Sequence, residues 1–189
     1  MTPILGITAS QITGHLWAPG KDYDSIATTT VGGGGASSIT FSSIPSTYKH
    51  LQIRGIAQRT TASTFSAVNI VFNSDTTNTN YARHDLYGTG AATGASGIPT
   101  ASNTSKAYVY VGSGSAFGPA VIDILDYTDT NKYKTLRGLG GVDNNGSGLV
   151  AFNSSLWLST SAITSITLTI DTSATFSQYS SFALYGIKG

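Results

Sequence analysis

The segments PAVIDILDYTDTNKYKTLRGLG (119–140), GLVAFNSSLWLSTSAITSITLTI (148–170) and SFALYGIKG (181–189) decide the fold of this chain. They are rich in β-branched and aromatic residues, which favour the pleated, half-buried surface of a strand. Asp, Asn, Gly and Ser separate the apolar runs, and these residue types favour tight turns. The last third of the chain is therefore predicted to be a series of short strands.

The same pattern extends back to residue 26 and gives ten or eleven strands in all. In residues 48–59, apolar or small side chains alternate with mostly polar ones, which is typical of a strand with one buried face. The DNNG segment (143–146) is predicted to be a hairpin turn. Residues 89–105 are low-complexity Gly, Ala, Ser and Thr, and are interpreted as a surface loop. Strands are predicted over 26–31, 36–44, 48–59, 66–73, 81–88, 106–112, 119–127, 132–140, 148–159, 163–170 and 180–188.

Many short strands separated by regular turn signals indicate an all-β domain. We expect an antiparallel β-sandwich of the jelly-roll kind over residues 26–189. Residues 1–25 differ, because their apolar spacing fits neither a strand nor a helix cleanly. We interpret them as an N-terminal arm, extended or with a short helix, for attachment or subunit contact. Its candidate attachment residues are Ile4, Leu5, Ile7, Ile12, Leu16 and Trp17.

The arm has two alternative roles at this stage. It either folds back onto the core of its own domain or docks into a neighbouring subunit, since chain ends need such contacts to be ordered. Its apolar run is interrupted by polar and glycine residues and lacks a basic start, so it does not resemble a signal peptide.

Composition limits the classes of function. Charged residues make up only 10% of the 189 residues and the net charge is +1, against about 25% charged residues in an average domain. This balance gives no electrostatic footprint for a nucleic-acid partner. The chain has no Cys, which excludes disulfides, thiolate metal sites and a Cys nucleophile. No stretch is apolar enough for a membrane span.

Candidate catalytic groups are few. His50 and His84 lie on predicted strands and could meet at a metal with Asp85 or Asp123, but clustered ligand spacing is missing. Asp123 and Asp126 should face opposite sides of a strand, so they do not form an acid/base pair. No GxSxG nucleophile motif is present. We therefore predict no enzymatic activity, no cofactor and no metal site.

The phrases MTPILGITASQITGHL (1–16), IATTTVGGGGASSITFSSIPSTYKHLQIRG (26–55), YARHDLYG (81–88), DYTDTNKYKTLRGLGG (126–141) and SSFALYGIKG (180–189) resemble small proteins of tailed bacteriophages, in which they occur in this order. The resemblance covers nearly the whole chain and carries no catalytic signature. It implies a virion structural protein. Phages use jelly-roll trimers, often with an N-terminal arm, as head-decoration (cement) proteins, and other similar chains are tail or fibre components.

We therefore expect a capsid decoration protein on the virion surface that forms a homo-oligomer, with a trimer as the expected form. Its expected partners are the major capsid protein or tail proteins. The alternative is a tail-fibre or tail-associated host-recognition protein that binds a surface glycan. The ten Tyr residues and the polar loop tips 74–80 and 128–131 motivate this alternative, because aromatic rings stack on sugars and on protein partners. A hydrolase would need two converging carboxylates, which no spacing favours.

Overall fold

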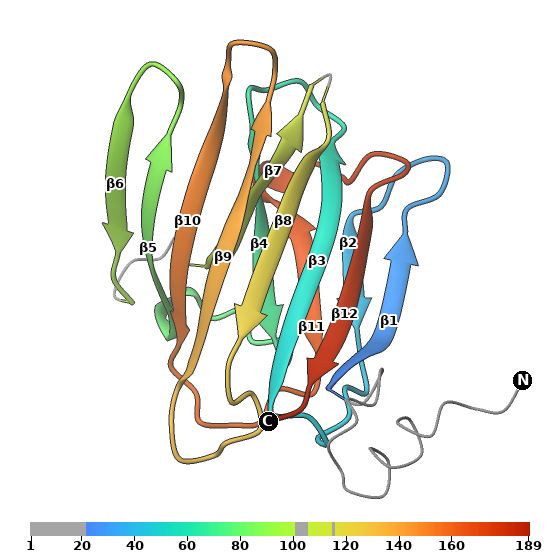
Figure 1. The fold of residues 1–189 in the computed structure, drawn as a ribbon, viewed down its shortest axis with the longest axis vertical. Coiled ribbons are helices and arrows are strands. Elements are labelled where there is room, and N and C mark those ends of the chain that lie inside the picture. Colours follow the sequence, from blue (N-terminus) through green and yellow to red (C-terminus); the bar gives the residue numbers. More distant parts are fainter. Residues whose placement is uncertain (1–21, 101–105, 115) are drawn as a thin grey trace, which may run out of the picture.

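The computed structural model describes residues 22–100, 106–114 and 116–189 (Figure 1). Within these ranges the chain forms twelve β-strands and two short 3-10 turns, and no α-helix. The prediction of an all-β fold is confirmed. The first strand begins at Tyr23, three residues before the predicted start. The six candidate attachment residues of the arm lie outside the described residues.

Every strand except β6 overlaps a predicted one. The 3-10 turns are Asn78–Asn80 and Asp171–Ser173. The strands are β1 (Tyr23–Thr30), β2 (Ser38–Phe41), β3 (His50–Arg59), β4 (Ser66–Phe72), β5 (Tyr81–Gly88), β6 (Thr93–Ile98), β7 (Ala107–Ser113), β8 (Gly118–Ile124), β9 (Lys134–Asp143), β10 (Gly148–Trp157), β11 (Ile166–Ile170) and β12 (Ser181–Ile187).

The strand β6 corrects the interpretation of residues 89–105 as a surface loop. Its Gly, Ala, Ser and Thr residues favour a loop by composition, yet the segment pairs antiparallel with β5 along its whole length. The glycines of β6 leave room for two side chains of β5. A Cβ on Gly94 would lie 2.6 Å from the Tyr87 ring, and one on Gly97 would lie 2.8 Å from the His84 ring. The rings of β5 therefore lie where β6 has no side chains.

The DNNG segment forms the predicted hairpin turn between β9 and β10. The Asn144 N–H donates to the Ser147 carbonyl at 2.8 Å. Asn145 and Gly146 adopt positive φ values of 56° and 99°, which Asn and Gly tolerate better than other residues.

The strands form one large, mixed and mostly antiparallel sheet. One run of strands, the front strands, has the order β1-β12-β3-β8-β9-β10-β5-β6, and the rear strands have the order β2-β11-β4-β7. The two runs join where β3 and β7 pair in parallel, at Gln58–Gly112 and Arg59–Ser113. Figure 1 shows the rear strands behind the front ones, and β7 contacts β8, β9 and β10 without pairing with them.

The core lies between the front and rear strands. On β3, Leu51 and Ile53 are fully buried while Arg54 is exposed, as the alternation of residues 48–59 predicts. The same apolar cluster includes side chains from the rear strands, such as Val68 and Val109. Burial of such side chains contributes about 1.5–3 kcal/mol each, which makes this cluster the main stabilising element.

Two glycines of β9 allow the backbone of β7 to approach closely. A Cβ on Gly140 would lie 2.2 Å from the carbonyl oxygen of Tyr110, and one on Gly138 would lie 3.2 Å from a methyl group of Val109. A clash with a backbone atom cannot be relieved by a side-chain rotation. The identity of Gly140 is therefore required by the packing of β7, whereas Gly138 has more room.

We predict that Gly140→Ala lowers the free energy of unfolding by about 1–3 kcal/mol, because the backbones of β7 and β9 must separate. Gly138→Ala serves as a matched control and should change stability by less than about 1 kcal/mol, or raise it, because alanine restricts the unfolded chain. Urea unfolding of the two variants measures the difference. Equal losses for both variants would contradict the close approach at Gly140.

Candidate functional site

An apolar strip lies uncovered on the outer face of the front strands. Leu86, Val150, Phe152 and Leu139 are 60%, 57%, 61% and 42% exposed, respectively. They are neighbours, because Phe152 pairs with Leu86 on one side and with Leu139 on the other. Val121 of β8 extends the row as the partner of Leu139. The largest contiguous apolar patch on a protein surface is often functional, so this strip is a candidate contact surface.

A hollow of about 650 Å³ continues the apolar strip. Val150, Leu139 and the glycines Gly88 and Gly141 are among its lining residues. Both glycines pair with Val150, so side chains are missing on either side of it. The hollow is therefore suited to receive an apolar side chain from a partner.

A row of polar side chains crosses the same face beside the strip. His84, Ser154, Arg137, Asp123 and Gln52 are successive cross-strand partners from β5 to β3. Arg137 Nη1 donates to Ser154 Oγ at 2.6 Å, and Gln52 Nε2 donates to Asp123 Oδ1 at 2.7 Å. These bonds hold the side chains in fixed positions along the row.

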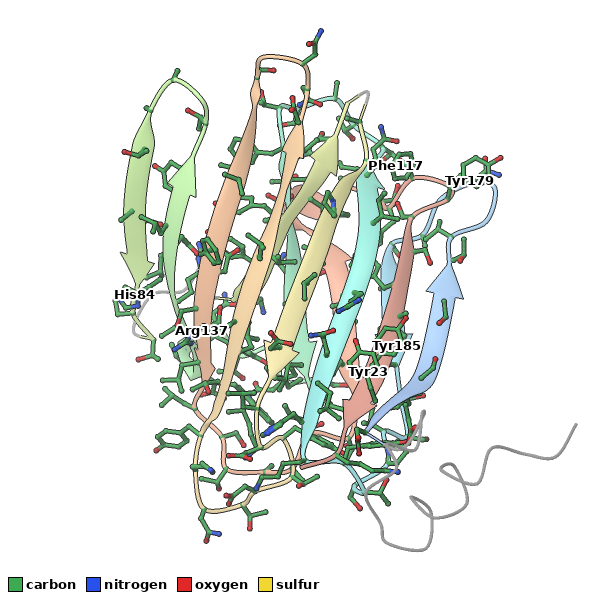
Figure 2. The ribbon with its side chains drawn as sticks, viewed as in Figure 1. Tyr23, His84, Phe117, Arg137, Tyr179 and Tyr185 are labelled. Carbon is green, nitrogen blue, oxygen red and sulfur yellow. The ribbon has the colours of Figure 1, made fainter. Side chains whose placement is uncertain are left out.

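The row ends at an aromatic pair on β1 and β12. The Tyr23 and Tyr185 rings are stacked with centroids 4.8 Å apart. Figure 2 shows them near one edge of the front strands, whereas His84 lies near the other edge. The Tyr23 hydroxyl donates to Gln52 Oε1, which also accepts from Arg54 Nε at 2.8 Å. Burial raises the pKa of Tyr23 more than Arg54 lowers it, so this hydroxyl remains a donor at neutral pH.

A buried carboxylate supports the strip from beneath. Asp85 of β5 is 4% exposed and accepts hydrogen bonds from Tyr108 of β7 at 2.5 Å, Asn153 of β10 at 2.6 Å and Ser96 of β6 at 2.9 Å. Burial, and then the bond to Asp85, raise the pKa of Tyr108, which keeps its hydroxyl protonated as a donor. A buried carboxylate is tolerated only with such partners, and these fix β5, β6, β7 and β10 together.

The histidines considered as metal ligands do not meet. His84 is exposed on the outer face, and Asp85 is buried on the other, as expected for neighbours on a strand. His50 begins β3, and its Nδ1 accepts the backbone N–H of Asp126 at 3.0 Å. Asp123 is on the outer face, while Asp126 follows the end of β8. Among the described residues, no group of three His, Asp or Glu is placed to hold a metal ion.

The first loop tip considered for glycan binding uses its carboxylate internally. In residues 74–80, the Asp75 carboxylate accepts from the Thr77 N–H at 3.0 Å, Asn80 Nδ2 at 2.8 Å and Trp157 Nε1 at 2.8 Å. These bonds order the loop and anchor it to β10. They also occupy the polar group most suited to bind a sugar hydroxyl.

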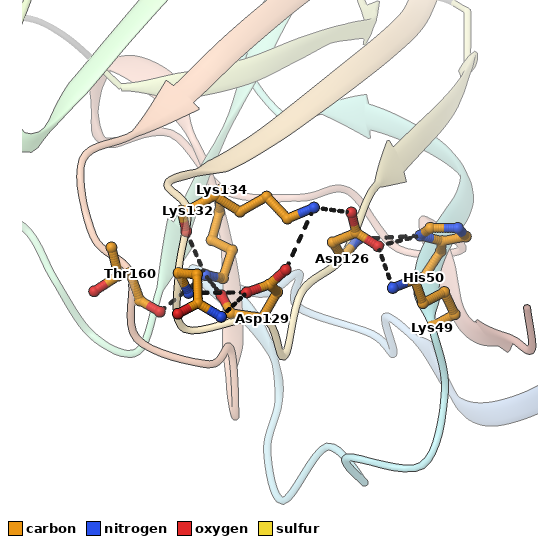
Figure 3. A network of polar contacts seen from close by, with 8 residues as sticks. Lys49, His50, Asp126, Asp129, Lys132, Lys134 and Thr160 are labelled. Atoms are coloured by element: carbon orange, nitrogen blue, oxygen red, sulfur yellow. Dashed lines mark hydrogen bonds and ion pairs between the residues drawn. The ribbon is translucent and has the colours of Figure 1, made fainter.

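The second tip, 128–131, belongs to a charged network drawn in Figure 3. Asp126 lies 2.5 Å from Lys132 Nζ and 3.1 Å from Lys49 Nζ, and Lys132 also contacts Asp129 at 3.4 Å. The Lys132 and Lys49 ammonium groups lower the pKa of the Asp126 carboxyl to about 2. The network ties the β8–β9 connection to the beginning of β3.

A buried ammonium fixes the same connection. Lys134 is only 1% exposed, and its Nζ donates to the carbonyl oxygens of Asp129 at 2.5 Å, Lys132 at 2.9 Å and Thr160 at 3.0 Å. Burial lowers the pKa of Lys134, although Asp129 opposes this effect. The three carbonyls compensate the buried charge and hold two loops at one end of the molecule.

Sequence reasoning missed the apolar strip, since it could not tell which face of β9 and β10 is covered. The available signal was the presence of Val150 and Phe152 two residues apart, together with Leu139.

Comparison with known proteins gives no match to a family model, a curated protein or a solved structure. Within the described ranges, no helix is long and apolar enough to cross a membrane.

We predict that Asp126→Asn changes the dependence of stability on acid. The folded pKa of Asp126 is about 2, below its ordinary value of 3.8, so ionised Asp126 stabilises the fold above pH 4. This contribution is lost as the pH falls from about 4 to about 2. The difference in melting temperature between wild type and variant should therefore be largest above pH 4, shrink as the pH falls toward 2, and vanish only below pH 2. A difference that is constant over this range would refute the ion-pair role.

Proposed function

We propose that this protein is a virion structural protein, and specifically a capsid decoration protein on the particle surface. The observation that carries this proposal is the strand order. Without the hairpins β5–β6 and β9–β10, the front strands read β1-β12-β3-β8 and the rear strands β2-β11-β4-β7. When the two orders are aligned, strands that are consecutive in the chain take corresponding positions: β1 with β2, β12 with β11, β3 with β4, and β8 with β7.

Such an arrangement supports a jelly-roll sandwich, in which strands that follow one another in the chain face each other across the core. Jelly rolls are recurrent building blocks of viral particles. The two hairpins are then additions to one sheet of the roll, and they carry Leu86, Leu139, Val150 and Phe152. The uncovered apolar surface therefore belongs to the strands that are added to the eight strands of the roll.

The resemblance of five sequence phrases to phage proteins supports a place in the virion. On this proposal the protein is a homo-oligomer, with a trimer as the expected form. The N-terminal arm attaches it to the major capsid protein or to tail proteins. Multiple copies on a symmetric particle bind strongly even if each single contact is weak.

The alternative function is glycan binding by a tail-fibre or tail-associated protein. One observation favours it: a second hollow, of about 630 Å³, is lined by Phe152, Arg137, His84 and Ser154 on the outer face. An exposed ring beside cationic and hydroxyl groups suits a sugar. A glycan array with the folded protein separates the functions, because a decoration protein should bind none of the glycans.

We predict that deletion of residues 1–20 abolishes attachment to particles and leaves the melting temperature almost unchanged. The deletion removes Ile4, Leu5, Ile7, Ile12, Leu16 and Trp17 but leaves every described strand intact. Co-sedimentation with particles that lack the protein measures attachment, and circular dichroism measures stability.

Two outcomes would contradict this prediction. If the arm covers the core of its own domain, losing several apolar side chains at about 1.5–3 kcal/mol each would consume most of the 5–15 kcal/mol of a typical domain. The melting temperature would then collapse. Absence of the full-length protein from purified virions would overturn the proposed function itself.

A further inference from the structure

We propose that the apolar strip, Leu86, Leu139, Val150 and Phe152, is the surface through which copies of this chain bind one another. This inference deepens the proposed function and rests on its self-association. It assigns the oligomer contact to the outer face of β5, β10 and β9, rather than to the arm or to the loop ends.

The size of the surface fits a contact between folded subunits. Burial of a Val, Leu or Phe side chain contributes about 1.5–3 kcal/mol at about 25 cal/mol per Å², which corresponds to about 60–120 Å² of apolar area each, so the exposed parts of these four side chains amount to roughly 200 Å². A stable contact covers roughly 800 Å² on each partner. The strip would supply the apolar centre of such a contact, and the hollow and polar row beside it would supply the rest. An apolar centre with a polar rim is the usual anatomy of an interface.

The charges around the strip favour a second copy of the same chain as the partner. No strip residue is charged. Four charged residues lie beside the strip: Arg54 is the cross-strand partner of Val121, Asp123 is the partner of Arg137, and Asp143 lines the hollow. The formal charges of these four cancel. A rim of one sign would repel an identical rim, whereas a balanced rim can pair with itself. A strongly charged partner would find no complementary field here.

The strip is also held in place before binding. Asp85 joins β5, β6 and β10 to β7 through hydrogen bonds of 2.5–2.9 Å. The absence of a side chain at Gly140 lets the backbone of β9 lie directly against the backbone of β7. A preorganised surface loses little conformational freedom on association, so more of the contact energy remains as affinity.

The test compares variants of the exposed strip with a control on the same face. Phe152→Ser and Leu139→Asp, alone and combined, disturb the strip without touching the buried core. Thr28→Asp is the control, because Thr28 is exposed and lies on the same outer face, away from the strip. Its cross-strand partner is Ala183, which in turn pairs with the exposed Arg54. Light scattering coupled to size-exclusion chromatography measures the mass, and circular dichroism verifies the fold of each variant.

We expect the full-length wild type and Thr28→Asp to have a multiple of the 19.5 kDa chain mass. The strip variants should have the mass of one chain with an unchanged melting temperature. Because Phe152→Ser is a mild change at an exposed position, it keeps the test valid if Leu139→Asp impairs folding. A folded strip variant that keeps the wild-type mass overturns the inference, and so does a monomeric wild type.

Binding to particles, measured on the same variants, separates this inference from the proposed function. An oligomer that depends on the strip but is absent from virions supports the inference and defeats the proposed function. A monomeric wild type whose particle binding is lost in Phe152→Ser assigns the strip to a shell protein, which overturns self-association only. Loss of glycan binding in that variant, with a monomeric wild type, likewise overturns the inference in favour of a sugar ligand.

Discussion

The close approach of β7 to β9 is the constraint on which the rest of the structure depends. It requires the absence of a side chain at Gly140, where a Cβ would lie 2.2 Å from a carbonyl oxygen of β7. Because β7 also pairs in parallel with the end of β3, its position joins the rear strands to the front strands at two places. The core between them, and the outward direction of Arg137 and Leu139, follow from that position.

The front strands β5 and β10 show an inversion of the usual burial pattern. Asp85 and Asn153 are buried on the inner face of these strands, while Leu86 and Phe152 are exposed on the outer face. Hydrogen bonds from Tyr108, Asn153 and Ser96 make the buried carboxylate acceptable. The exposed apolar residues have no comparable compensation within the described chain. A partner surface would provide it, and this asymmetry is the physical reason to look for function on this face.

The sequence predicts most strands because their alternation is visible, as in residues 48–59, where Leu51 and Ile53 are buried as expected. It does not predict β6, because Gly94 and Gly97 lower strand propensity and their packing against Tyr87 and His84 is a tertiary effect. It also does not predict the apolar strip. Periodicity separates the two faces of β10 but does not say which one is covered, and the buried face holds Asn153 and Ser155 while the exposed one holds Val150 and Phe152.

The short, glycine-containing β6 is the last strand at one end of the front run. A terminal strand offers free backbone donors and acceptors, and a long apolar one would invite uncontrolled extension by other chains. Six residues of mostly Gly, Ala, Ser and Thr make a poor template for such growth. Lateral polymerisation is thereby discouraged at this edge. The self-association that we propose uses the side-chain surface instead, where contacts can form closed assemblies of limited size.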